Sequence, residues 1–173
     1  WKPGKIVDVG PRSAHIANLQ YAAYSESDDF KDIELEHFSP KTGDPDDYLK
    51  FRVRNMDYTI TPSGASYFLG LVKDCGHGEA NLNAVKNAFQ AVAAKIGLKP
   101  EILSENILEV CSNKVSRVID ALVREYKMDK EFLSLVGGGG GASAIVPFTA
   151  KKLKLPHNIA LNSEVISAIG AAL

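Results

Sequence analysis

FLSLVGGGGGASAIV, residues 132–146, joins two apolar segments through five consecutive glycines, out of 14 in the chain. The run Phe132–Val136 is typical of a buried strand, and the segment that begins at Ala142 is compatible with a helix. A strand, a glycine-rich turn and a helix together bring a backbone without Cβ atoms, and the positive end of a helix, to the oxygens of a phosphate or ribose. We therefore predict that a nucleotide binds at Gly137, Gly138, Gly139, Gly140 and Gly141.

Two other interpretations of the glycine run stay open. One is close backbone packing without a ligand, and the other is a flexible linker, although linkers are usually interleaved with serine and flanked by polar residues. The run does not match a Walker loop, because Ala142 and Ser143 follow it and no lysine does. A Rossmann fingerprint also fits poorly, since the acidic residue about 20 positions further on, Glu164, stands where a helix begins.

The composition is that of a globular protein. With 45% hydrophobic and 24% charged residues, the chain is not intrinsically disordered. Its 20 basic and 21 acidic side chains give a net charge of −1 without a basic stripe, so we expect no nucleic acid partner. No apolar run approaches the roughly 20 residues of a membrane span, and two cysteines are too few for a disulfide scaffold. We expect a cytoplasmic protein without membrane contact.

The length of 173 residues corresponds to a single domain. The chain opens at Trp1 without an initiator Met and closes at Leu173 within an Ala-rich helical pattern that has no stop signal. We therefore expect residues 1–173 to be one partial domain of a longer polypeptide.

The first part of the chain predicts strands. Lys5–Val9 is a short apolar run that is typical of a buried strand. Tyr48–Val53 alternates between apolar and polar side chains, and Tyr58–Thr61 returns after a turn, which is typical of a hairpin with one wet face that ends at Pro62. The acidic segment Ser25–Glu36 lacks the spacing of a calcium loop, so we expect it to be a solvated surface segment.

The second part predicts helices over Ala80–Ile96, stopped by Gly97, and over residues 100–126, opened by Pro100. Pro147 either kinks the helix after the glycines or opens another. The buried stripe of the long helix is expected to be Leu103, Ile107, Cys111, Val115, Val118 and Leu122. A last helix is expected to begin at Asn162 or Ser163 and to bury Val165, Ile166, Ile169 and Leu173.

Four blocks together resemble the hydantoinase/oxoprolinase family. They are VGPRSAHIA over residues 9–17, ITPSGA over residues 60–65 with Leu69 and Gly70 after it, LVGGGGGASAIVP over residues 135–147, and EVISAIGAAL over residues 164–173. The similarity touches most of the chain in the same order, which makes it more specific than any single motif.

The resemblance implies one lobe of an actin-like or sugar-kinase-like ATPase fold, with a mixed sheet, packed helices and a nucleotide bound between two lobes. It adds Ala142 and Ser143 to the glycines as nucleotide-binding positions. It also implies that ATP phosphorylates a cyclic amide or a carbonyl oxygen, so that ring opening or carboxylation becomes feasible. The implied partners are an N-terminal lobe outside this chain, a second enzyme subunit and a small-molecule substrate.

The phosphate-gripping Asp-x-Gly-Gly-Thr turn of this fold is absent from the sequence. Asp8 begins a similar pattern, but a proline and Arg12 stand where glycine and threonine are needed. We therefore expect the missing lobe to hold the β- and γ-phosphates and Mg²⁺. Arg12 and His15 are candidate residues of the cleft, with a structural hydrogen bond as the alternative for His15. No metal site is expected, because Cys75 and His77 have no second pair of ligands.

Three functions follow from these features. The first is the nucleotide-binding part of an ATP-dependent hydrolase that acts on cyclic amides of the hydantoin or 5-oxoproline type, or of a related ATP-dependent carboxylase. The second is a non-catalytic reactivating or assembly factor with the same ATPase fold. The third is a structural α/β domain whose glycines serve packing alone.

Overall fold

The computed structural model describes residues 6, 19–39, 42–43, 48–72, 80–139 and 141–172. The chain divides into two compact units, Trp1–Ile107 and Leu108–Leu173, which we call unit 1 and unit 2. Helices and strands occur in both units, which confirms an α/β chain with a mixed sheet, whereas the actin-like lobe and the single domain stay predictions. Of the predicted strand over residues 5–9 only Ile6 is described, and it belongs to no helix or strand.

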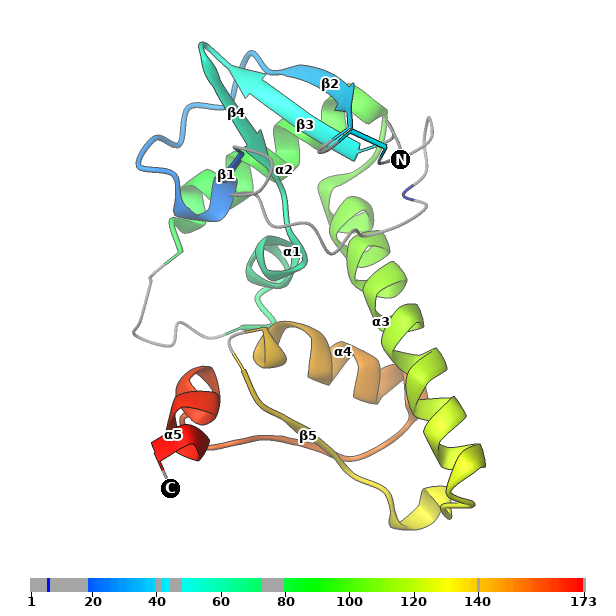
Figure 1. The fold of residues 1–173 in the computed structure, drawn as a ribbon. Coiled ribbons are helices and arrows are strands. Elements are labelled where there is room, and N and C mark those ends of the chain that lie inside the picture. The colour runs from blue at the N-terminus through cyan, green and yellow to red at the C-terminus, as the bar shows by residue number, and fades with distance from the viewer. Residues whose placement is uncertain are drawn as a thin grey trace. The chain divides into compact units, whose positions relative to one another are not determined.

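Unit 1 contains a four-stranded mixed sheet in the order β1-β4-β3-β2 (Figure 1). Its strands are β1 (Gln20–Tyr21), β2 (Glu34–Phe38), β3 (Tyr48–Val53) and β4 (Met56–Thr59). Strand β4 pairs with β1 in parallel and with β3 in antiparallel, and β2 pairs with β3 in antiparallel. The predicted hairpin is confirmed as β3 and β4, although its second strand begins two residues early, at Met56 instead of Tyr58.

Aromatic side chains fill one side of this sheet. The ring of Phe30 lies edge-on at 5.6 Å from Phe51 and at 5.2 Å from Tyr58, the favourable arrangement for aromatic quadrupoles. Phe30 belongs to the acidic segment 25–36, whose acidic residues are exposed as expected. The segment is more than a solvated loop, however, because Phe30 and Ile33 are buried and β2 begins at Glu34.

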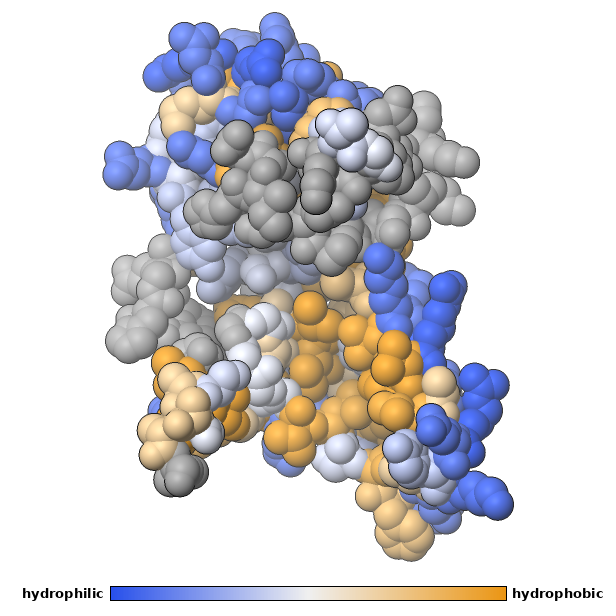
Figure 2. All heavy atoms as spheres, viewed as in Figure 1, coloured by the Kyte–Doolittle hydropathy of each residue, from blue (hydrophilic) through white to orange (hydrophobic). Residues whose placement is uncertain are grey.

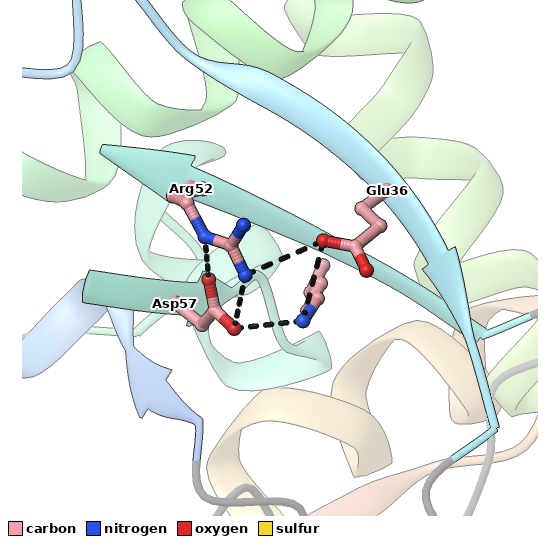
Figure 3. Close-up of polar contacts among 4 residues, drawn as sticks. Glu36, Arg52 and Asp57 are labelled. Atoms are coloured by element: carbon pink, nitrogen blue, oxygen red, sulfur yellow. Dashed lines mark hydrogen bonds and ion pairs between the residues drawn. The ribbon is translucent and has the colours of Figure 1, made fainter. Parts of the chain in front are cut away.

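The other side of the sheet holds an ion network across three strands (Figure 3). Asp57 on β4 accepts hydrogen bonds from Arg52 Nε at 2.7 Å and from Lys50 Nζ at 2.7 Å. The Oε2 atom of Glu36 on β2 lies 3.3 Å from Lys50 Nζ and 3.4 Å from Arg52 Nη2. The hydrogen bonds from Arg52, and then those from Lys50, lower the pKa of Asp57 despite its partial burial.

Helix α1 (Pro62–Phe68) follows the hairpin, so Pro62 begins a helix as well as ending a strand. Thr61 is its N-cap, accepting a hydrogen bond from the Gly64 amide at 3.0 Å. Helix α2 (Leu82–Ile96), which passes behind the sheet in Figure 1, was predicted and is confirmed. It ends at Gly97, whose φ of 71° is left-handed.

Asn81 connects the start of α2 to the segment between β1 and β2. Its side-chain oxygen accepts a hydrogen bond from the Ala84 amide at 3.0 Å, which caps the helix. Its amide nitrogen donates to the Ser25 carbonyl at 2.9 Å, and its backbone amide donates to the Ala23 carbonyl at 2.8 Å. A single side chain therefore fixes both the start of α2 and the short 3₁₀ helix η1 (Ala22–Tyr24).

Helix α3 (Pro100–Glu125) has the predicted bounds, but its predicted buried stripe is wrong beyond Ile107. Val118 and Leu122 are 60% and 42% exposed, Val115 is also exposed, and Cys111 is half-buried. The buried positions are Leu103, Ser104, Ile107, Leu108, Ser112, Ser116 and Val123. Lys152 on α4 donates to Glu109 at 2.8 Å and to Asn113, both on α3.

Unit 2 contains the 3₁₀ helix η2 (Lys130–Phe132), strand β5 (Leu135–Gly137), helix α4 (Ala142–Leu153) and strand β6 (His157–Ile159). Strands β5 and β6 pair in parallel, and α4 contacts both. The strand predicted over 132–136 is therefore shorter, because its first residue lies in η2. Pro147 lies inside a continuous α4 and opens no second helix. Figure 2 shows apolar residues gathered over α4.

The chain then enters the 3₁₀ helix η3 (Ser163–Val165) and helix α5 (Ile166–Ala172). The expectation that this last helix buries an apolar side is wrong for the residues described, since Val165 is 44% and Ile169 is 42% exposed. Leu173 lies outside the described residues. In the described part of the chain, no helix combines the length and apolar character needed to cross a bilayer.

We predict that Asn81→Ala lowers the free energy of unfolding by about 1–2 kcal/mol, because it removes a helix cap and a second hydrogen bond together. Urea denaturation measures this loss. The matched control is Asn87→Ala, which removes one hydrogen bond to the Asp28 carbonyl and should cost less than about 1 kcal/mol. Equal losses in the two variants would contradict the double role of Asn81.

We predict that Asp57→Asn destabilises the protein at neutral pH and removes part of its acid sensitivity. The folded-state pKa of Asp57 is lowered, so its contribution is present above the unfolded pKa and is lost as the pH falls through the folded pKa. Urea midpoints of wild type and variant should therefore differ at about pH 7, and the difference should narrow as the pH falls below about 4. Asp29→Asn, in an exposed pair with Arg54, is the control and should change little at either pH. A constant gap at both pH values would refute this role for Asp57.

Candidate functional site

The glycine turn lies between β5 and α4 and is held by backbone hydrogen bonds on both sides. The Ala160 amide donates to the Gly137 carbonyl at 2.8 Å, and the Gly139 amide donates to the Ser163 carbonyl at 2.6 Å. The Ala142 amide donates to the Gly139 carbonyl at 3.0 Å, which closes the turn onto the helix. These bonds do not fit a flexible linker, because a linker has no fixed partners for its backbone.

Gly137 is a packing position. A Cβ added there would lie 2.8 Å from Ile159 Cδ1 and 3.0 Å from both Ala142 Cβ and Val146 Cγ2. Gly137 also pairs directly with Ile159 in the parallel register of β5 and β6. The lack of a side chain therefore allows β6 and α4 to meet at this one residue.

The following glycines differ from Gly137 in what surrounds them. A Cβ on Gly138 would lie 3.2 Å from Ile166 Cγ2, at the start of α5. Gly139 has a φ of 99°, which side chains rarely tolerate, and a Cβ there or on Gly141 would meet no atom of the described residues within 4 Å. Gly140 lies outside the described residues. The turn thus has a first half covered by its own chain and a second half with open space.

Helix α4 begins directly after this open space. Gly141 is its N-cap, and the Ala144 and Ile145 amides both donate to the Gly141 carbonyl at 3.2 Å. Ala142 is buried, whereas Ser143, in the first turn, is half-buried. Gly141 provides no side-chain cap for this 12-residue helix, and the Ala142 and Ala144 amides of its first turn donate to the Gly139 and Gly141 carbonyls.

Arg12 and His15, the other predicted site residues, lie outside the described residues. The same holds for Asp8, Cys75 and His77. Among the residues that are described, no group of three or more His, Cys, Asp or Glu side chains is placed to hold a metal ion. The candidate site therefore rests on the glycine turn and the start of α4.

The sequence did not indicate the residues that contact the turn from beyond α4. Ile159 lies on β6, and Ser163 and Ile166 lie on η3 and at the start of α5. Their signal is indirect: glycines that follow a strand need apolar partners to fill the missing Cβ space, and Ile159 and Ile166 supply them.

A comparison with protein-family models finds one that matches residues 2–173 and is described as Hydantoinase/oxoprolinase. This match covers nearly the whole chain, including the glycine turn, α4 and the blocks that carry the resemblance. No curated protein and no solved structure matches the chain.

We predict that Gly137→Ala lowers stability more than Gly141→Ala does. The Gly137→Ala methyl group meets three close atoms and should lower the free energy of unfolding by about 1–3 kcal/mol. The Gly141→Ala methyl group meets no described atom within 4 Å, so the change should cost less than about 1 kcal/mol, the difference between glycine and alanine at a helix N-cap. Urea denaturation of the two variants checks this. Equal stability of both would show that the three contacts at Gly137 do not constrain the turn.

Proposed function

The chain belongs to the hydantoinase/oxoprolinase family, and we propose that it is the nucleotide-binding part of an ATP-dependent hydrolase that acts on cyclic amides. The substrates are rings of the hydantoin or 5-oxoproline type, with a related ATP-dependent carboxylase subunit as the variant of the same chemistry. The observation that carries this proposal is the coincidence of the family match with a strand–glycine turn–helix that has open backbone space at Gly139 and Gly141.

The proposed chemistry explains why such an enzyme needs a nucleotide. An amide carbonyl is a poor electrophile, because the nitrogen lone pair delocalises onto the oxygen. Transfer of the γ-phosphoryl group of ATP to that oxygen breaks the bond to ADP and leaves an activated carbon. Water then adds to the carbon, and the ring C–N bond breaks with a proton passing to the nitrogen, which leaves an acyl phosphate. A second water hydrolyses the acyl phosphate to a carboxylate and free phosphate. The enzyme gains rate by stabilising the charge of these steps.

The described residues support a division of labour in nucleotide binding. Gly139, Gly141 and the first turn of α4 are the proposed contacts, because a Cβ on either glycine would meet no described atom within 4 Å and the helix end is positive. Gly137 and Gly138 have a structural role in the turn, since side chains of the chain itself already lie where their Cβ atoms would be. The β- and γ-phosphates and Mg²⁺ are assigned in this proposal to another lobe or subunit, together with Arg12 or His15 at the cleft.

Turnover distinguishes this hydrolase from a reactivating or assembly factor of the same fold. The intact enzyme assembly is incubated with ATP and with hydantoin or 5-oxoproline, and phosphate and ring-opened product are measured together. Phosphate release that depends on the ring substrate supports the hydrolase. Slow phosphate release without ring opening, combined with a stable partner complex, supports the factor.

We predict that Gly141→Val weakens binding of a fluorescent ADP analogue at least about tenfold, because the branched side chain enters the space proposed for the nucleotide. Fluorescence anisotropy measures the dissociation constant. Position 141 is the better choice than 139, since the positive φ of Gly139 strains any other residue. The control is Ala94→Val, an exposed site on α2, which should bind as wild type does. Undiminished affinity in Gly141→Val would remove the turn from the nucleotide site.

A further inference from the structure

The segment that follows β6 lies on Gly138 and Gly139 of the glycine turn. The Gly139 amide donates a hydrogen bond to the Ser163 carbonyl at 2.6 Å. Ile166 Cγ2 covers Gly138, at 3.2 Å from where its Cβ would stand. Two neighbouring groups of the turn, one polar and one apolar, thus have partners within the chain.

The segment that makes these contacts is weakly held. Helix α5 has seven residues, Ile166–Ala172, all of them exposed, and its main contacts are with η3 directly before it. A helix of this length is unstable in water unless tertiary contacts hold it. Segments with few buried contacts open at the lowest free energy in a folded protein. Local opening of η3 and α5 would therefore release Gly138 and Gly139 without unfolding β5, β6 or α4.

We propose that η3 and the start of α5 form an autoinhibitory cap on the glycine turn, in which Ser163 and Ile166 compete with a nucleotide for the backbone of Gly138 and Gly139. With the cap closed, a nucleotide reaches Gly141 and the start of α4 but not the Gly139 amide. With the cap lifted, the same amide becomes a donor for a ribose or phosphate oxygen. This inference rests on the proposed nucleotide site and adds a regulation of it.

Opening of the cap affects the apparent dissociation constant of the nucleotide. If only the fraction of molecules with a lifted cap binds fully, the apparent dissociation constant rises as that fraction falls. Weakening the contact between Ile166 and Gly138 should therefore tighten nucleotide binding, which is the opposite of what a stabilising lid would show.

The test compares Ile166→Ala with Ile169→Ala in the intact chain. Both substitutions remove the same atoms from exposed positions of α5 and change helix propensity equally, but only Ile166 contacts the turn. Ile166→Ala should lower the dissociation constant of the fluorescent ADP analogue about three- to tenfold, and Ile169→Ala should leave it within about twofold. Without ligand, hydrogen exchange of the Gly139 amide should be faster in Ile166→Ala than in wild type or in Ile169→Ala.

The outcomes separate the cap from the nucleotide site itself. An affinity that is unchanged or lower in Ile166→Ala, while wild type binds the ADP analogue, overturns the cap and leaves the nucleotide site intact. Unchanged exchange of the Gly139 amide also overturns the cap, because the contact then does not protect that amide. If neither wild type nor Ile166→Ala binds the analogue, both the nucleotide site and its regulation are refuted.

Discussion

Unit 2 depends on the absence of a side chain at position 137. Strand β6 pairs with β5 there, and α4 approaches the same residue from the turn, so three elements meet at one Cα atom. A methyl group would stand 2.8 Å from Ile159 Cδ1, closer than carbon atoms pack. Ordering a glycine costs up to about 1 kcal/mol more than ordering an alanine, and the contacts of Ile159 and Val146 around it offset part of that cost.

The close packing at Gly137 also determines what surrounds the glycines that follow it. Because β6 is fixed at Gly137, the chain after it returns over Gly138 and Gly139, and Ser163 and Ile166 come to lie on them. Because α4 is fixed from the other side, its first turn stands beside the open space at Gly141. The five glycines of the sequence are therefore not equivalent, although a composition-based interpretation treats them as one feature.

Local signals in the sequence were sufficient to predict an element when residues at its own ends fix where it starts and stops. Helix α2 has a cap at Asn81 and a stop at Gly97, and both ends were predictable within two residues. Helix α1 was missed although Thr61 and Pro62 form a start signal, because proline also ends a strand. Strand β6 was missed because His157 and Asn158 are polar and exposed, so it has no pattern of its own and exists through its pairing with β5.

The buried side of α3 was predictable only in its first turns. Spacing identifies the large apolar residues, and it selected Val118 and Leu122, which are exposed. The positions that are buried there include Ser112 and Ser116. Hydrophobic spacing alone cannot indicate such a face, because a serine contributes nothing to an apolar stripe in the sequence.

Of the three interpretations of the glycine run, the backbone hydrogen bonds argue against a linker and the contacts at Gly137 support packing. Packing does not account for the whole run, however. At Gly141 the φ is −95°, which any residue adopts, and a Cβ there meets nothing within 4 Å. Neither backbone strain nor crowding within the described chain requires glycine at that position. Glycine is among the residues favoured at a helix N-cap, and the nucleotide approach that we propose would be a second reason for glycine there.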